Sequence, residues 1–147
     1  MADRTESSVV VDAAPADVLD VIADFAAYPE WTGAVREAEV LEEDEDGWAS
    51  TVRFVLDARP IRDTYTLAYT WDVAEDGTGV VSWTLVEAGI LKAMDGAYRL
   101  AARGDGTEVT YQLSVELKMA MLGMLRRKAE KAIIDTALNE LKKRAEG

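Results

Sequence analysis

The chain has 147 residues, of which 49% are hydrophobic, a formal net charge of −12, and neither histidine nor cysteine. These proportions are typical of a globular protein large enough to bury a core, and we expect residues 1–147 to form a single domain. The missing residue types exclude disulfides, catalytic triads built on His, Cys nucleophiles and His- or Cys-ligated zinc sites. Any catalysis must therefore use carboxylates, tyrosines, lysines or hydroxyls, and we expect neither a metal site nor a cofactor.

The charge is unevenly distributed along the chain. From Lys118 onward there are eight basic and four acidic residues, whereas the preceding 117 residues contain eight basic and 24 acidic ones. Because an acidic body repels phosphates, no nucleic-acid partner is expected. The basic runs RRK (126–128) and KKR (142–144) are interpreted as the solvated face of a helix, and docking to an anionic partner is the alternative.

The sequence also bears on location. It contains no run of about 18 apolar residues that could span a bilayer. The first residues, MADRTESS, lack the basic and apolar regions of a signal peptide. We therefore expect a cytoplasmic protein without a transmembrane segment, and we leave its oligomeric state open.

The first 33 residues predict a short strand and two short helical segments. Residues 9–11 form a β-rich run, and Pro15 suits the first turn of a helix because its missing N–H has no partner there. Apolar residues then recur at spacings of four and three: Val18, Ile22 and Phe25. The residue before Pro29 is disfavoured in the helical region, so residues 28–33 are expected to form a break or a second short helical turn.

From Val35 the hydrophobic period changes to two, which predicts six more strands. They are expected at about 35–41, 48–56, 61–71, 81–85, 94–100 and 109–117. The turns between them include EDGTG (75–79) and RGDGTE (103–108), which are typical of tight hairpins. Short turns of this kind imply an antiparallel meander.

After Lys118 the period returns to that of a helix of about 25 residues, roughly 37 Å long. Its apolar positions recur every three or four residues: Leu122, Leu125, Ala129, Ile133, Ala137 and Leu141. The order of elements predicts an α+β fold, in which a curved seven-stranded antiparallel sheet wraps around the long C-terminal helix and two short helices follow the first strand.

A cavity is expected between the sheet and the long helix. One helix roughly 10 Å across cannot fill the concave side of a strongly curved sheet, and Gly96 leaves room at an inward position between Met94 and Tyr98. Periodicity alone does not separate ligand contacts from ordinary core residues. The candidate ligand-binding residues are Tyr28, Trp31, Val52, Phe54, Tyr65, Leu67, Tyr69, Trp83, Leu85, Met94, Tyr98, Met121 and Leu125.

Few side chains near this cavity could perform chemistry. Tyr65 and Tyr98 are candidates through their hydroxyl groups. Glu87 shares strand parity with Trp83, and Asp63 shares parity with Tyr65, so each could face the cavity mouth, where burial would raise the carboxyl pKa. A solvated carboxylate at a strand end is the alternative for both acids.

Several segments together resemble a known family. The segment VVVDAAPADVLDVIADFAAYPEW, the strand VREAEVLEE, the hairpin series and the final amphipathic helix resemble the START-related SRPBCC superfamily, which has the helix-grip fold. The resemblance extends from Glu6 to about Ala145. Its most specific part is a strand, an AP helix start and the pattern D-F-x-x-Y-P-x-W. The most similar subgroup is that of the bacterial polyketide cyclase/dehydrase and coenzyme Q-binding proteins.

The resemblance implies a deep apolar cavity that binds a hydrophobic molecule. We expect non-catalytic binding or transport of a lipid, an isoprenoid quinone or a polyketide-like aromatic, with a polyketide aromatase/cyclase/dehydrase or an interaction module for a protein or an anionic surface as alternatives. Aromatase/cyclase members are thought to use a cavity arginine on the strand that here reads RDTYTLAYTW. Arg62 has outward parity there, so this chain departs from that pattern and an enzyme is the less favoured interpretation.

Overall fold

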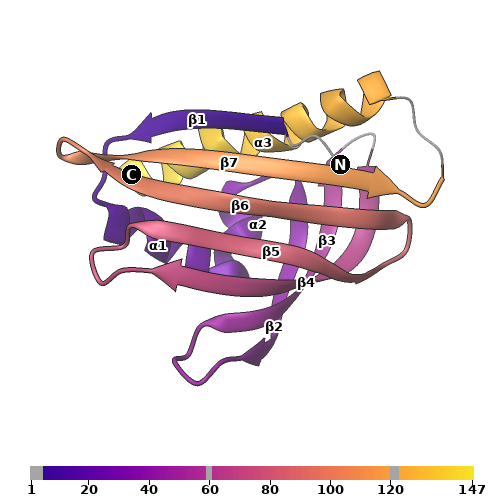
Figure 1. The fold of residues 1–147 in the computed structure, drawn as a ribbon, viewed down its shortest axis with the longest axis horizontal. Helices are drawn as coiled ribbons and strands as arrows, with labels where there is room; N and C mark the ends of the chain where they lie inside the picture. Colours follow the sequence, from indigo (N-terminus) through magenta and orange to yellow (C-terminus); the bar gives the residue numbers. More distant parts are fainter. Residues whose placement is uncertain (1–4, 59–60, 120–122) are drawn as a thin grey trace.

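The computed structural model describes residues 5–58, 61–119 and 123–147 (Figure 1). Seven antiparallel strands form one sheet in the order β1-β7-β6-β5-β4-β3-β2. The strands are β1 (Thr5–Val11), β2 (Val35–Glu43), β3 (Ala49–Ala58), β4 (Ile61–Val73), β5 (Gly79–Ala88), β6 (Leu91–Arg103) and β7 (Gly106–Leu117). The helical elements are α1 (Pro15–Ala23), η1 (Phe25–Ala27), α2 (Tyr28–Trp31) and α3 (Gly123–Glu146). The predicted helix-grip architecture is confirmed.

The strand β1 is longer than the apolar run that predicted it. It begins at Thr5, where it pairs with Leu113 of β7, and its polar first half still alternates between exposed and half-buried positions. Backbone pairing with β7 therefore extends the strand beyond its hydrophobic residues. At the other edge of the sheet, β2 pairs only with β3 among the described strands.

Residues 28–31 form a helical turn although the residue before a proline is disfavoured in that conformation. Tyr28 has φ −51° and ψ −45°, which are helical values. Pro29 lies in the first turn of α2, where its missing N–H costs no hydrogen bond. The proline therefore starts the turn, and the alternative of an irregular break is wrong.

The long C-terminal helix is present as α3, although Leu122, the first apolar position predicted for it, lies outside the described residues. Lys118 and Met119 form a bend after β7, and α3 starts at Gly123. Leu125, predicted on the buried face, is 47% exposed. The buried residues of α3 lie further along the helix: Ala129, Glu130, Ile133, Ile134, Leu138 and Leu141. Among the described helices, none has the length and apolar character needed to cross a membrane.

A buried carboxylate joins the first half of α3 to the sheet. The Thr5 hydroxyl donates to Glu130 Oε1 at 2.6 Å, and the Val115 N–H donates to Oε2 at 2.6 Å. Val115 lies two residues beyond Leu113, whose partner Thr5 is the first described residue of β1. Glu130 therefore accepts a backbone N–H of β7 next to the described start of β1.

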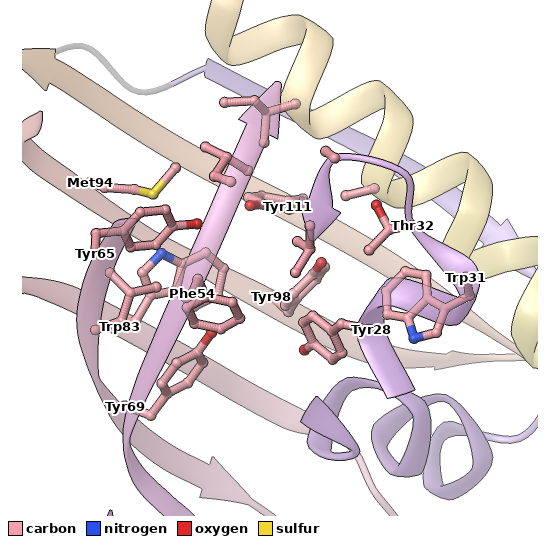
Figure 2. Close-up of a pocket in the computed structure, with 16 residues that line it drawn as sticks. Tyr28, Trp31, Thr32, Phe54, Tyr65, Tyr69, Trp83, Met94, Tyr98 and Tyr111 are labelled. Atoms are coloured by element: carbon pink, nitrogen blue, oxygen red, sulfur yellow. The ribbon is translucent and has the colours of Figure 1, made fainter. Parts of the chain in front are cut away.

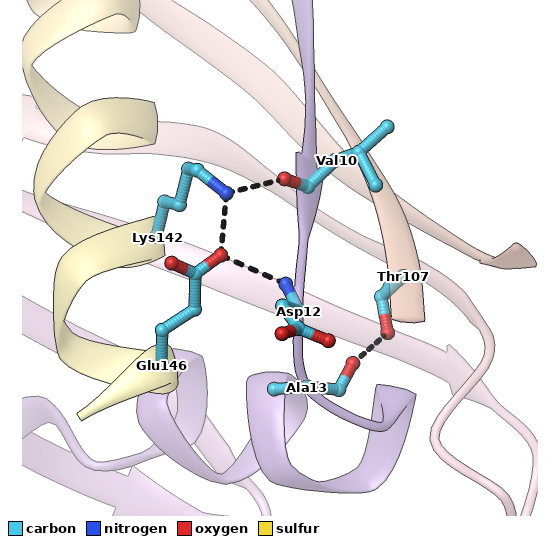
Figure 3. Close-up of polar contacts among 6 residues, drawn as sticks. All are labelled: Val10, Asp12, Ala13, Thr107, Lys142 and Glu146. Carbon is cyan, nitrogen blue, oxygen red and sulfur yellow. Dashed lines mark hydrogen bonds and ion pairs between the residues drawn. The ribbon is translucent and has the colours of Figure 1, made fainter. Parts of the chain in front are cut away.

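The last turns of α3 are attached to the junction between β1 and α1 (Figure 3). The Lys142 ammonium donates to the Val10 carbonyl at 2.8 Å and forms an ion pair with Glu146. The Glu146 carboxylate accepts the Asp12 N–H at 2.8 Å. This backbone hydrogen bond and the Lys142 side chain lower the pKa of the Glu146 carboxyl group. Together with Glu130, these contacts hold α3 to the sheet near both of its ends.

Candidate ligand-binding cavity

A cavity lies between the concave face of the sheet and α3 (Figure 2). Its volume, measured as the space open to the centre of a water molecule, is about 60 Å³. The strands β3 to β7 supply one wall, and the segment after α1 and the middle of α3 supply the other. The lining residues are Tyr28, Trp31, Thr32, Ala34, Val35, Phe54, Leu56, Tyr65, Leu67, Tyr69, Trp83, Met94, Tyr98, Tyr111, Ile133 and Ala137.

All five tyrosines of the chain line this one cavity. They come from α2, β4, β6 and β7, so residues far apart in the sequence meet at one place. Together with neighbouring aromatic residues, the tyrosine rings form an aromatic wall. The ring centroids of Phe54 and Tyr65 are 5.5 Å apart, and those of Tyr98 and Tyr111 are 4.6 Å apart. Tyrosine combines a large apolar ring with one polar atom, which suits it to contact an apolar molecule that carries oxygen atoms.

Only one of the five hydroxyls is used within the described structure. Tyr28 Oη donates to the Ile22 carbonyl at 2.5 Å. No side-chain hydrogen bond joins the hydroxyls of the other four tyrosines to another described residue. Figure 2 shows the hydroxyls of Tyr65 and Tyr111 turned toward one another across the cavity. Four phenol groups are therefore available to a bound molecule.

Burial keeps these phenols neutral. Removal from water raises the pKa of each of the five tyrosine hydroxyls well above its ordinary value of 10, and the proximity of Tyr111 raises the pKa values of Tyr28, Tyr65, Tyr69 and Tyr98 further. A phenol with a raised pKa is a hydrogen-bond donor and a poor base. The lining residues include no charged side chain, so the described wall of the cavity has no partner for a charged ligand group.

Gly96 does not leave the open space that its position predicted. A Cβ atom there would lie 2.6 Å from Cζ2 of Trp83 and 2.6 Å from the Gln112 carbonyl oxygen. The Trp83 indole therefore occupies the space above Gly96, and the glycine is required by this close approach. The open volume lies instead among the tyrosines.

Most of the residues predicted to contact a ligand line the cavity, but four do not or cannot be placed. Val52 is fully buried in the core, Leu85 is half-buried, and neither reaches the cavity. Leu125 lies on the exposed first turns of α3, and Met121 lies outside the described residues. Conversely, Tyr111 was not among the predicted contacts, although it shares strand parity with the inward residues Val109 and Leu113, and this parity would have found it.

The two candidate carboxylates do not face the cavity. A register shift between β4 and β5 pairs Glu87 with Thr66 and Leu85 with Leu67, so one extra residue, Val86, inverts the parity of the rest of β5. Glu87 is consequently exposed. Asp63 instead accepts the N–H groups of Gly89, Ile90 and Leu91 at 3.1, 2.9 and 3.0 Å, which holds the turn between β5 and β6.

The basic residues also lie away from the cavity. The Arg62 side chain is 70% exposed and lies 3.5 Å from the Asp57 carboxylate, so it does not supply the cavity arginine of the aromatase/cyclase pattern. In the run 126–128, Arg127 and Lys128 are exposed on the first turns of α3. Docking of a protein or an anionic surface at this run stays a prediction.

A helix-grip protein with an internal aromatic cavity is the class that the fold and the site define. The chain belongs to the family described as polyketide cyclase/dehydrase and lipid transport, whose model matches residues 11–142. The predicted resemblance to polyketide cyclase/dehydrase proteins is thereby confirmed, and a coenzyme Q-binding subgroup stays a prediction.

Solved structures share this fold. A START superfamily protein from Mycobacterium smegmatis is 21% identical with a TM-score of 0.88, and the match covers 97% of each chain. An aromatase/cyclase from Streptomyces sp. R1128 is 21% identical with a TM-score of 0.75, covering 99% of this chain and 94% of that one. A fragment of a STAR-related lipid transfer protein from Xanthomonas axonopodis is 19% identical with a TM-score of 0.78, covering 98% and 86%. These similarities establish the fold.

Proposed function

We propose that the protein binds and carries an uncharged hydrophobic molecule that bears several oxygen atoms. Among the ligand classes expected from the sequence, an isoprenoid quinone or a polyketide-like aromatic fits this description best. The observation that carries the proposal is the wall of five tyrosines, four of whose hydroxyls have no described protein partner, with no charged side chain beside them. A fatty acid or a phospholipid would place a charged group there without a partner, which is costly in an apolar site.

Apolar burial would supply most of the affinity. At about 25 cal/mol per Å², the burial of about 300 Å² of apolar ligand surface contributes about 7.5 kcal/mol before the cost of association. Each hydroxyl that donates to a ligand oxygen adds about 1 kcal/mol and fixes its orientation. Aromatic rings on both sides of the cavity favour a planar ligand over a flexible chain.

A panel of matched ligands tests this function. Thermal shift and titration calorimetry are carried out with a short-chain quinone, a polyphenol, and a fatty-acid anion of similar size. We expect the two uncharged oxygenated molecules to raise the melting temperature and the fatty acid to have little effect. Native mass spectrometry of protein purified from its source should show an uncharged apolar compound bound to it. A preference for the fatty acid, or no binding of any member of the panel, would contradict the proposal.

A cyclase/dehydrase is the second candidate function, favoured by the family and by the grouped phenols. Neutral phenols could donate hydrogen bonds to a developing enolate oxygen of a polyketide. Tyr65→Phe and Tyr98→Phe would then lower turnover of a polyketide substrate without unfolding the protein. Equal turnover by both variants and the wild type would remove these two tyrosines as catalytic residues. Glu87→Gln is the control, because Glu87 is exposed and outside the cavity.

A further inference from the structure

The cavity is too small for the ligands proposed above. A volume of about 60 Å³ holds only a few water molecules, whereas ordinary ligand pockets measure about 300–1,000 Å³. Entry of a quinone-sized molecule therefore requires part of the wall to move. The part most able to move is the one where the wall between the cavity and the outer surface is thinnest.

That wall is one side chain thick between α2 and α3. Trp31 lines the cavity and also lines an outer groove of about 780 Å³ formed with Thr136, Asn139 and Arg144 of α3. Trp31 borders a further hollow beside α1 as well. On the other side of the same seam, Ala34 and Ile133 line both the cavity and an outer hollow. Figure 2 shows Trp31 and Thr32 on the side of the cavity next to α3.

We propose that ligands enter the cavity through this seam, between residues 31–33 and α3, and that the Trp31 side chain is the gating residue. The inference rests on the proposed function, because it concerns the route to the same cavity. Trp31 is 8% exposed, and its side chain lies between the cavity and the groove because it lines both. Rotation of this side chain outward joins the two spaces.

The polar contacts across the seam are weak and exposed. The Gly33 N–H donates to the Glu140 carboxylate, with 3.2 Å to Oε2 and 3.4 Å to Oε1. Arg144 and Glu30 form an exposed ion pair at 3.4 Å. Water can replace both contacts when the seam opens, so their loss is cheap. A route through the sheet would instead break the ladder hydrogen bonds between neighbouring strands, which water inside the core could not replace.

The segment 31–33 moves, and α3 stays in place. The helix is held to the sheet by Glu130 at one end and by Lys142 and Glu146 at the other. The segment, by contrast, leads into the edge strand β2. Apart from the Gly33–Glu140 contact, its backbone is held by the Thr32 N–H, which donates to the Tyr28 carbonyl at 2.9 Å, and by the Ala34 carbonyl, which accepts the Asp57 N–H at 2.7 Å. A Cβ atom at Gly33 would meet no atom within 4 Å, so this residue lies in open space.

The first test measures exchange of a ligand with and without the Glu140 contact. The probe is an uncharged naphthalene ketone, 6-propionyl-2-(dimethylamino)naphthalene, whose fluorescence changes on entering an apolar site. Glu140→Ala should raise both the association and the dissociation rate about three- to tenfold and leave the dissociation constant within about twofold. Asp135→Ala is the control, because this carboxylate lies on the same helix and contacts Lys131 instead of the seam. Wild-type rates in Glu140→Ala would overturn the proposal.

The second test locks the seam. Because the chain contains no cysteine, the double variant Gly33→Cys, Thr136→Cys can be joined by a short bismaleimide at these two sites alone. Both positions border the same outer hollow, and a side chain at Gly33 has room. Cross-linking should slow probe uptake at least about tenfold and retain probe that was loaded beforehand. Each single variant, blocked with a simple maleimide, should exchange the probe normally. Unchanged uptake by the cross-linked protein would place the entrance elsewhere.

A third measurement separates this proposal from the proposed function. If no probe binds the wild type, the binding function fails, but the seam can still be tested by hydrogen–deuterium exchange. Glu140→Ala should speed exchange of the Gly33 amide about three- to tenfold and leave the amides of α1 unchanged. Equal protection of Gly33 in the variant and the wild type would show that Glu140 does not hold the seam, whatever the ligand result.

Discussion

Tyr28 and Tyr98 have the same side chain in the same cavity but different hydrogen-bond partners. Tyr28 Oη donates to the Ile22 carbonyl, whereas Tyr98 Oη makes no side-chain hydrogen bond to a described residue. The Tyr28 hydroxyl therefore stabilises the fold, and the Tyr98 hydroxyl is available to a ligand. Tyrosine-to-phenylalanine changes at these two positions form a matched pair.

We expect one variant to lose ligand affinity and the other to lose stability. Tyr98→Phe should weaken binding of an oxygenated ligand about three- to tenfold and leave the free energy of unfolding nearly unchanged, because only a ligand bond is lost. Tyr28→Phe should cost about 1 kcal/mol of stability and leave the affinity nearly unchanged. Calorimetry measures the affinity and urea unfolding the stability. Equal effects of the two changes on affinity would contradict this division of roles.

Residue-level prediction from the sequence succeeded where a side chain follows strand parity. Phe54, Tyr65, Leu67, Tyr69, Trp83, Met94 and Tyr98 line the cavity as their strand positions suggested. It failed where a neighbour decides the outcome. The missing side chain of Gly96 predicted open space, because no pattern in the sequence indicates that the Trp83 ring from the adjacent strand lies over it.

At the scale of elements, a single extra residue had the largest effect on prediction. Strand order, helix order and the tight turns follow from periodicity, because alternation and helical spacing extend over many residues. A bulge changes only one position and is invisible to that pattern. The extra residue Val86 places Glu87 on the outside of the sheet and removes it from the candidate acids.

The attachment of α3 to the sheet is a second feature that no periodicity reveals. Glu130 lies among apolar positions of the helix, and its carboxylate accepts both the Thr5 hydroxyl and the Val115 N–H. A buried charged acceptor with two donors contributes more than a surface ion pair. Glu130 should therefore matter far more to stability than the other carboxylates of α3.

Glu130→Gln tests this difference within one helix. The Gln oxygen can still accept the Val115 N–H, but its NH₂ group must donate to the Thr5 hydroxyl, which changes from donor to acceptor, so we expect a loss of about 1 kcal/mol in the free energy of unfolding. Asp135→Asn, which disturbs only an exposed pair with Lys131, should cost less than about 0.5 kcal/mol. Urea unfolding of both variants gives the comparison. A Glu130→Gln protein as stable as the wild type would show that this contact does not hold the helix.

At the scale of the whole molecule, the five buried phenols link stability to alkaline pH. Burial raises the pKa of each hydroxyl in the folded protein, whereas in the unfolded chain the pKa returns to its ordinary value of 10. The unfolded state therefore releases these protons first as pH rises. The stabilisation is complete below about pH 10 and is lost above it, at about 1.4 kcal/mol per pH unit for each tyrosine.

Five such groups should make alkaline unfolding steep. A free energy of unfolding of about 5 to 15 kcal/mol would be exhausted within about one to two pH units above pH 10. We expect phenolate absorbance to appear in one cooperative step together with loss of the near-ultraviolet circular dichroism. Gradual ionisation near pH 10 with the fold intact would contradict the burial of the tyrosines. A protein denatured in urea is the control and should ionise gradually.

The four tryptophans fall into two optically distinct pairs. Trp31 and Trp83 line the cavity, whereas Trp48 and Trp71 stack on one another with ring centroids 4.7 Å apart and do not line it. A quinone in the cavity would accept excitation energy from the first pair and dim the intrinsic fluorescence. We expect the stacked pair to give an exciton couplet in circular dichroism that is lost when unfolding separates the two rings. Emission and circular dichroism from one unlabelled sample can thus distinguish an occupied protein from an unfolded one.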